Sequence, residues 1–136
     1  MSKSTLKRVL NAELPSAFRE IQLELAREPK HPVGDMAIGY TVIAPLMLNG
    51  MIDANLWRKH RAACRVVRRR PNEADGVGHL VHRQGGNWAI EYDVAGDMPS
   101  EAGYHFSDEH FVVGEYVSIK EGDQFHTFRV TSVSPL

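Results

Sequence analysis

The sequence has few cysteines and no long apolar run, the two features that would indicate an oxidising compartment or a membrane. One cysteine in 136 residues cannot form a disulfide within the chain. The longest apolar run, residues 42–48, is interrupted by Pro45 and is far shorter than the roughly 20 residues of a membrane span. Residues 1–12 carry cations without the apolar stretch of a secretory signal. We therefore expect a cytoplasmic protein without a membrane partner.

The motifs of several enzyme classes are also missing. The sequence has no G-x-S-x-G nucleophile elbow, no glycine-rich phosphate loop followed by lysine, and no H-E-x-x-H or paired-cysteine metal motif. His60 and Cys64 would lie one turn apart on a helix, but a lone cysteine is more often a small core residue. We therefore expect a binding protein rather than an enzyme, and no cofactor.

The composition is typical of one globular domain. Hydrophobic residues make up 43% of the chain and charged residues 24%, and the formal net charge is −1. A chain of this length buries roughly two-thirds of its unfolded surface, which is enough for one core. We predict a single domain over residues 1–136, with residues 1–12 frayed.

The first ordered element is predicted to be an amphipathic helix over Leu14–Glu28. Apolar residues recur there at three- and four-residue spacing, and Pro15 and Pro29 suit its first turn and its end. The residues that form this apolar stripe are Leu14, Phe18, Ile21 and Leu25.

From His31 onward, short runs separated by Gly, Pro, Asn and Asp indicate strands. Alternation predicts a strand over Met36–Leu48, followed by a type I′ reversal at Asn49-Gly50. A short helix is expected over Ile52–Ala63 and a strand over Cys64–Arg70.

Two hairpins are predicted from alternating runs around turn-forming dipeptides. In Val77–Val94, a two-residue loop at Gly85-Gly86 places Val81 opposite Ile90. The second hairpin runs over Glu115–Val133 around Gly122-Asp123, and its predicted core face carries Val117, Ile119, Phe128 and Val130. Between the hairpins we expect a loop over 95–100 and a short strand within 104–113.

These elements predict an α+β fold. Its N-terminal amphipathic helix packs on a strongly curved, mainly antiparallel sheet or a small β-barrel of five to seven short strands, and one short helix is added to it.

Charge is the clearest unusual feature of the sequence. Residues 1–85 carry 14 Lys and Arg against 8 Asp and Glu, whereas residues 86–136 carry 2 against 9. Seven cations without an acid fall within thirteen residues, which is typical of an anion-binding strip. The main hypothesis is a binding module that recognises a partner protein or an anionic ligand through this strip and two tryptophans. Its candidate residues are Arg58, Arg61, Arg65, Arg68, Arg69, Arg70, Trp57 and Trp88.

Two other interpretations of the strip remain open. Single-stranded nucleic acid would use the arginines for phosphates and the tryptophans for stacking. Alternatively, the arginines pair with acidic side chains of the C-terminal half, across neighbouring strands. The sequence leaves the oligomeric state undetermined.

Seven histidines suggest a further alternative, a metal-dependent or catalytic protein. Its weak candidates are His79, His105, Asp108 and His110. His82 does not join His79, because strand residues three apart point to opposite faces.

Overall fold

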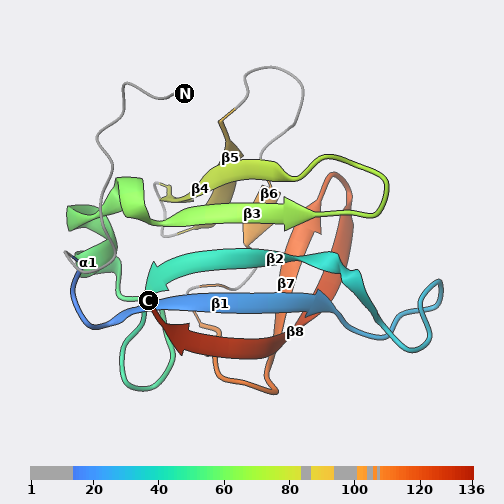
Figure 1. Ribbon diagram of the computed structural model, residues 1–136, viewed down its shortest axis with the longest axis horizontal. Helices are drawn as coiled ribbons and strands as arrows, with labels where there is room; N and C mark the ends of the chain where they lie inside the picture. The colour runs from blue at the N-terminus through green and yellow to red at the C-terminus, as the bar shows by residue number, and fades with distance from the viewer. Residues whose placement is uncertain (1–13, 84–86, 94–100, 104–105, 107) are drawn as a thin grey trace.

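The computed structural model describes residues 14–83, 87–93, 101–103, 106 and 108–136 (Figure 1). These residues form eight strands, one α-helix and one 3₁₀ turn. The strands are β1 Phe18–Leu25, β2 Asp35–Pro45, β3 Arg65–Arg69, β4 Gly76–His82, β5 Trp88–Tyr92, β6 Glu101–Gly103, β7 Tyr116–Glu121 and β8 Gln124–Pro135. The helix is α1, Ala54–Lys59, and the 3₁₀ turn is Arg61–Ala63.

The strands form a closed antiparallel barrel in their sequence order. Each strand pairs with the next one, and β8 returns to pair with β1. The seam between β6 and β7 is the shortest, with one paired position, Ala102 opposite Lys120. The antiparallel sheet predicted from the sequence is therefore confirmed, whereas the α+β class and the count of five to seven strands are wrong.

The predicted helix over Leu14–Glu28 is wrong, because most of this segment is β1. Helical spacing fits Phe18, Ile21 and Leu25, but it ignores Leu23. Every second residue from Ile21 to Leu25 is buried in the barrel. This alternation is the pattern of a strand, and pairing with β2 and β8 on both sides outweighs the helical pattern. The part of the prediction that concerns residues 1–12 lies outside the described residues.

The elements between residues 35 and 69 match the sequence analysis in kind. The reversal after β2 carries a hydrogen bond from the Gly50 amide to the Met47 carbonyl oxygen, 2.9 Å long, and Gly50 has a φ of 87°. Asn49 has no positive φ, so this turn is not of type I′. Asp53 caps α1 by accepting hydrogen bonds from the Asn55 and Leu56 amides.

The register of the β4–β5 hairpin differs by one residue from the prediction. Val81 lies opposite Ala89, and Leu80 lies opposite Ile90. The amide of Arg83 donates to the carbonyl oxygen of Asn87, which leaves three residues for the reversal instead of two. A one-residue shift moves every side chain to the other face, so Leu80 and Ile90 point into the barrel together.

The β7–β8 hairpin confirms the predicted register and core face. Val117 lies opposite Phe128, and Glu121 lies opposite Gln124. The four predicted core residues, Val117, Ile119, Phe128 and Val130, have no exposed surface. The strand expected within 104–113 is wrong for residues 106 and 108–113, which belong to no strand, and the loop over 95–100 lies outside the described residues.

The helix α1 covers the end of the barrel at which β1 begins, which we call the helix end (Figure 1). Trp57 turns inward from α1, and its indole N–H donates to the carbonyl oxygen of Leu80 at 2.8 Å. The buried rings of Phe106 and Phe111 pack edge to face 5.1 Å apart. In the described residues, neither helical segment has the length and apolar character needed to cross a bilayer.

Replacing Gly78 with alanine should destabilise the barrel by about 2 kcal/mol or more, because overpacking forces backbone to move. A Cβ atom at Gly78 would lie 2.3 Å from the carbonyl oxygen of Glu91 on the paired strand. Gly122→Ala is the control, since its Cβ would meet no atom within 4 Å and would cost only the strain of a positive φ, about 1 kcal/mol. Denaturant unfolding of both variants measures the difference, and equal losses would contradict this interpretation of Gly78.

Candidate functional site

The predicted arginine strip does not form one surface, because strand alternation and the turn before β3 divide it. Arg58 and Arg61 are exposed on α1 and the 3₁₀ turn, and Arg65 is exposed at the start of β3. Arg69 is only partly exposed, and it donates to the hydroxyl oxygen of Thr41 at 2.6 Å.

Arg68 and Arg70 turn toward the interior at the end of the barrel opposite the helix end. Arg70 and the hydroxyl group of Tyr40 both donate to a carboxylate oxygen of Glu121. A guanidinium nitrogen of Arg68 lies 3.7 Å from the other oxygen of Glu121, and a second lies 3.6 Å from Glu73. The side chains of Arg68, Arg70 and Glu121 are only 11–15% exposed. Glu121 belongs to the C-terminal half, as the pairing interpretation expects, but β7 is not a neighbour of β3 and these pairs lie inside the barrel instead of across neighbouring strands.

Glu121 is held as a carboxylate by this arrangement. Burial alone would raise its pKa, but the hydrogen bonds from Arg70 and Tyr40 and the charges of Arg70 and Arg68 lower the pKa below the usual range. The network therefore fills the interior at this end with paired charges in place of apolar side chains.

The two tryptophans of the predicted strip are core residues. Trp57 is 6% exposed and Trp88 is 3% exposed. The ring of His82 stacks on Trp88 with centroids 4.1 Å apart, and the guanidinium group of Arg61 lies 4.9 Å from the centroid of Trp57. Neither indole offers a free face on which a nucleic-acid base would stack.

The two candidate histidines that the structure describes have different partners. Nδ1 of His79 lies 2.9 Å from Asp93, and Nδ1 of His110 lies 2.6 Å from the carbonyl oxygen of Asn49. Asp108 is exposed, and His105 lies outside the described residues. Within the ranges that the structure describes, no three His, Cys, Asp or Glu side chains are placed to hold a metal ion.

Glu109, between two of these candidates, is a titratable group that the sequence analysis missed. Its Oε2 accepts a hydrogen bond from the Ser118 amide, and its buried Oε1 has no hydrogen-bond partner among the residues that the structure describes. The pKa of Glu109 is raised to about 7. Burial is the largest cause and the charge of Asp108 adds to it, while the hydrogen bond from Ser118 acts in the opposite direction. A carboxyl group with a pKa near neutrality suits acid–base chemistry, but the hydrogen bond from Ser118 fastens the loop of Glu109 to β7.

Cys64 is not placed as a nucleophile. Its side chain is fully buried, and its thiol contacts the carbonyl oxygen of His60 at 3.5 Å. Burial raises the pKa of the thiol to about 12, so the reactive thiolate is scarce at neutral pH.

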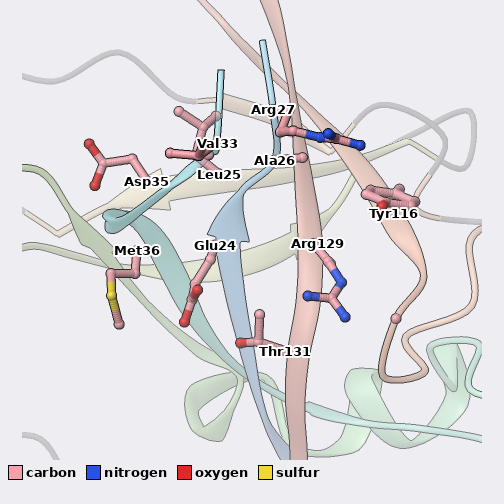
Figure 2. A pocket seen from close by; sticks show the side chains of 12 residues that line it. Glu24, Leu25, Ala26, Arg27, Val33, Asp35, Met36, Tyr116, Arg129 and Thr131 are labelled. Atoms are coloured by element: carbon pink, nitrogen blue, oxygen red, sulfur yellow. The ribbon is translucent and has the colours of Figure 1, made fainter. Parts of the chain in front are cut away.

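The pocket with the most suitable chemistry lies elsewhere, on the outer face of β1 and β8 (Figure 2). It has a volume of about 710 Å³ and is open to solvent. Its floor is formed by β1 and β8, one wall by the connection between β1 and β2, and the other by the start of β7. The side chains that line it include Glu24, Arg27, Val33, Asp35, Met36, Tyr116, Arg129 and Thr131.

The strand register aligns three of these residues in a row. Glu24 of β1 lies opposite Arg129 of β8, which lies opposite Tyr116 of β7. Directly paired strand residues on one face are close neighbours. Gly34 shapes the adjacent wall: its φ is 79°, and a Cβ there would lie 2.6 Å from the carbonyl oxygen of Leu25.

The pocket separates positive from negative charge. In Figure 2, Arg27, Arg129 and the ring of Tyr116 lie on one side, and the carboxylates of Glu24 and Asp35 lie on the other. Asp35 accepts a hydrogen bond from the Ala37 amide and lies 3.6 Å from His31. Arg27 and Arg129 are exposed and form no ion pair with any residue in the described part of the chain.

The sequence analysis missed this pocket because it searched for clustered arginines. Arg27 and Arg129 are about a hundred positions apart in the sequence. The available signal was the β7–β8 register, which already places Tyr116 opposite Arg129. The contribution of Arg27 and Glu24 required β1 to be a strand next to β8.

Comparison with known proteins adds no identification. The chain matches no protein-family model, no curated protein and no solved structure. The function must therefore be argued from the pocket itself.

Replacing Glu121 with glutamine should destabilise the fold by about 3 kcal/mol at neutral pH, because it leaves two guanidinium groups largely buried without their shared carboxylate. The pKa of Glu121 is lowered in the folded state. The stability that its carboxylate adds to the fold is therefore complete at pH values above the ordinary carboxyl pKa, and it is lost as the pH falls through the lowered pKa.

The difference in the free energy of unfolding between wild type and Glu121→Gln should therefore shrink on acidification. Urea unfolding at several pH values measures it. Glu115→Gln, which removes an exposed carboxylate, is the control and should have little effect. A difference for Glu121→Gln that persists unchanged at low pH would refute the network.

The thiol of Cys64 should react with an aromatic disulfide reagent only when the protein unfolds. Its burial and its raised pKa both suppress the thiolate in the folded state. Absorbance at neutral pH follows the reaction, with and without denaturant. Rapid stoichiometric reaction of the folded protein would return Cys64 to the list of candidate nucleophiles.

Proposed function

We propose that this protein is a binding module for a small ligand that carries an anionic group and a planar ring, held in the pocket of Figure 2. The single observation that carries the proposal is the pair of exposed arginines, Arg27 and Arg129, beside Tyr116, a residue that is 59% exposed. Neither arginine has a carboxylate partner within the described ranges.

The anionic group is the part of the ligand that the arginines would select. Guanidinium groups bind phosphate and carboxylate through paired hydrogen bonds, and these charge-assisted bonds are stronger than neutral ones. Arg27 enters the pocket from the segment after β1, and Arg129 enters from β8, so the anion would bridge two elements.

The ring and the opposite wall supply the remaining specificity. Tyr116 exposes enough of its ring for a planar group to stack on it. Glu24, facing Arg129 across the β1–β8 pair, would accept a hydrogen bond from an amino or hydroxyl group of the ligand. The volume lies within the range of small-molecule sites, which supports a small ligand over a folded partner.

A second groove, near the predicted strip, is less suitable for an anion. It has a volume of about 520 Å³ and is lined by Arg61, Arg83 and His79, among others. Arg83 is paired with Glu91 at 3.0 Å, and His79 with Asp93 at 2.9 Å. An anion there would have to displace carboxylates that are already in place.

Titration with adenosine monophosphate, followed by amide chemical shifts, tests the proposal. We expect saturable shifts at Tyr116 and Arg129, with weaker binding of inorganic phosphate and of adenosine, because each supplies only half of the contacts. Arg129→Gln and Tyr116→Ala should each weaken binding by about tenfold, or about 1.4 kcal/mol.

Arg65→Gln and Phe125→Ala are matched controls, because they remove an exposed arginine and an exposed ring that do not line the pocket. They should leave the affinity unchanged. Binding that is lost equally in the controls, or shifts that spread over the protein without saturation, would contradict the proposal.

A further inference from the structure

A second concave surface lies at the helix end and is mainly apolar. It has a volume of about 580 Å³ and is bounded by the turn after β2, the segment before β7 and the start of β1. Its apolar lining comprises Ala17, Leu46, Met47, Leu48, Phe111, Val112, Val113 and Val133. We call this surface the aliphatic groove.

Much of the rim of the aliphatic groove is exposed to water. Leu48 is fully exposed, and Met47, Val112 and Val113 are 43–55% exposed. Single exposed apolar residues are common on protein surfaces, but four of them around one depression form a contiguous apolar patch of the kind that marks a binding site. Removing this apolar surface from water would favour binding of a hydrocarbon chain.

The two loops that form the rim are fastened to each other. The Phe111 amide donates to the carbonyl oxygen of Gly50 at 2.8 Å, and Nδ1 of His110 lies 2.6 Å from the carbonyl oxygen of Asn49. A Cβ at Gly50 would lie 2.7 Å from a methyl group of Val112, so the loops are also in close contact. The groove is therefore formed before any ligand arrives.

Among the described residues, Arg19 is the one charged side chain that lines the aliphatic groove, and none of the others is a carboxylate. Its Nη1 donates to the carbonyl oxygens of Ser16 and Phe18, which hold the guanidinium group at the groove. Guanidinium has five N–H donors, so Nε and Nη2 remain for a ligand. Arg19 forms no ion pair with a residue of the described ranges.

We infer that the aliphatic groove binds a free aliphatic carboxylate of medium chain length. The hydrocarbon chain lies against Leu48, Val112 and Val113, and the carboxylate binds Arg19. Charge complementarity selects this occupant, since an uncharged chain would leave the cation of the groove unused. The site shares no residue with the pocket of Figure 2 and does not depend on the function proposed there.

Titration with decanoate below its micelle concentration, by calorimetry and amide shifts, tests this inference. We expect decanoate to bind about tenfold more tightly than decanol, which has the same chain without the charge. Arg19→Gln should remove this preference, and Arg19→Lys should keep most of it. Leu48→Glu and Val113→Glu change exposed residues, so they should fold normally and weaken decanoate binding by about tenfold or more.

Val33→Glu and Arg129→Gln are the controls, because both residues lie in the other pocket. They should leave decanoate binding intact, so failure of the proposed function would not affect this result. Equal affinity for decanoate and decanol, or binding that Leu48→Glu does not weaken, would overturn the inference. Sedimentation showing a dimer that Leu48→Glu dissociates would also overturn it, because the occupant would then be a second copy of the chain.

Discussion

Closure of the strand pairing around the barrel is the constraint on which the rest of the structure depends. When β8 pairs with β1, every strand has one inward face and one outward face. The inward positions must then be filled along the whole barrel. Apolar side chains fill the middle and the helix end, whereas Tyr40, Arg68, Arg70 and Glu121 fill the opposite end with paired charges.

This closure also decides which charges are available for binding. Arginines that point inward are occupied by Glu121, and their charge is used in the fold. Arg129 on the outer face of β8 and Arg27 just after β1 have no carboxylate partner in the described ranges and face a pocket. A count of cations along the sequence does not separate these two groups, because neighbouring strand residues point in opposite directions.

The sequence predicts the parts of this fold that depend on local signals. The β7–β8 hairpin has a tight turn at Gly122 and strict alternation, so its register and core face follow from the residues. For β1, the residues fit both helical and alternating patterns, and only its pairing with β2 and β8 decides between them. The candidate pocket depends on that same long-range pairing, which is why Arg27 and Glu24 were not found.

The pairing of β1 with β8 places the two ends of the barrel chain next to each other. Arg19 lies opposite Pro135, so the chain enters and leaves the barrel side by side at the helix end (Figure 1). A short linker from residue 135 to residue 18 would therefore span little distance, and new termini could be opened at the Gly122 turn, where a Cβ meets no atom. Such a circular permutant would keep every strand pairing and would break only the covalent connection between β7 and β8. A tag fused to its new termini would lie away from the helix end.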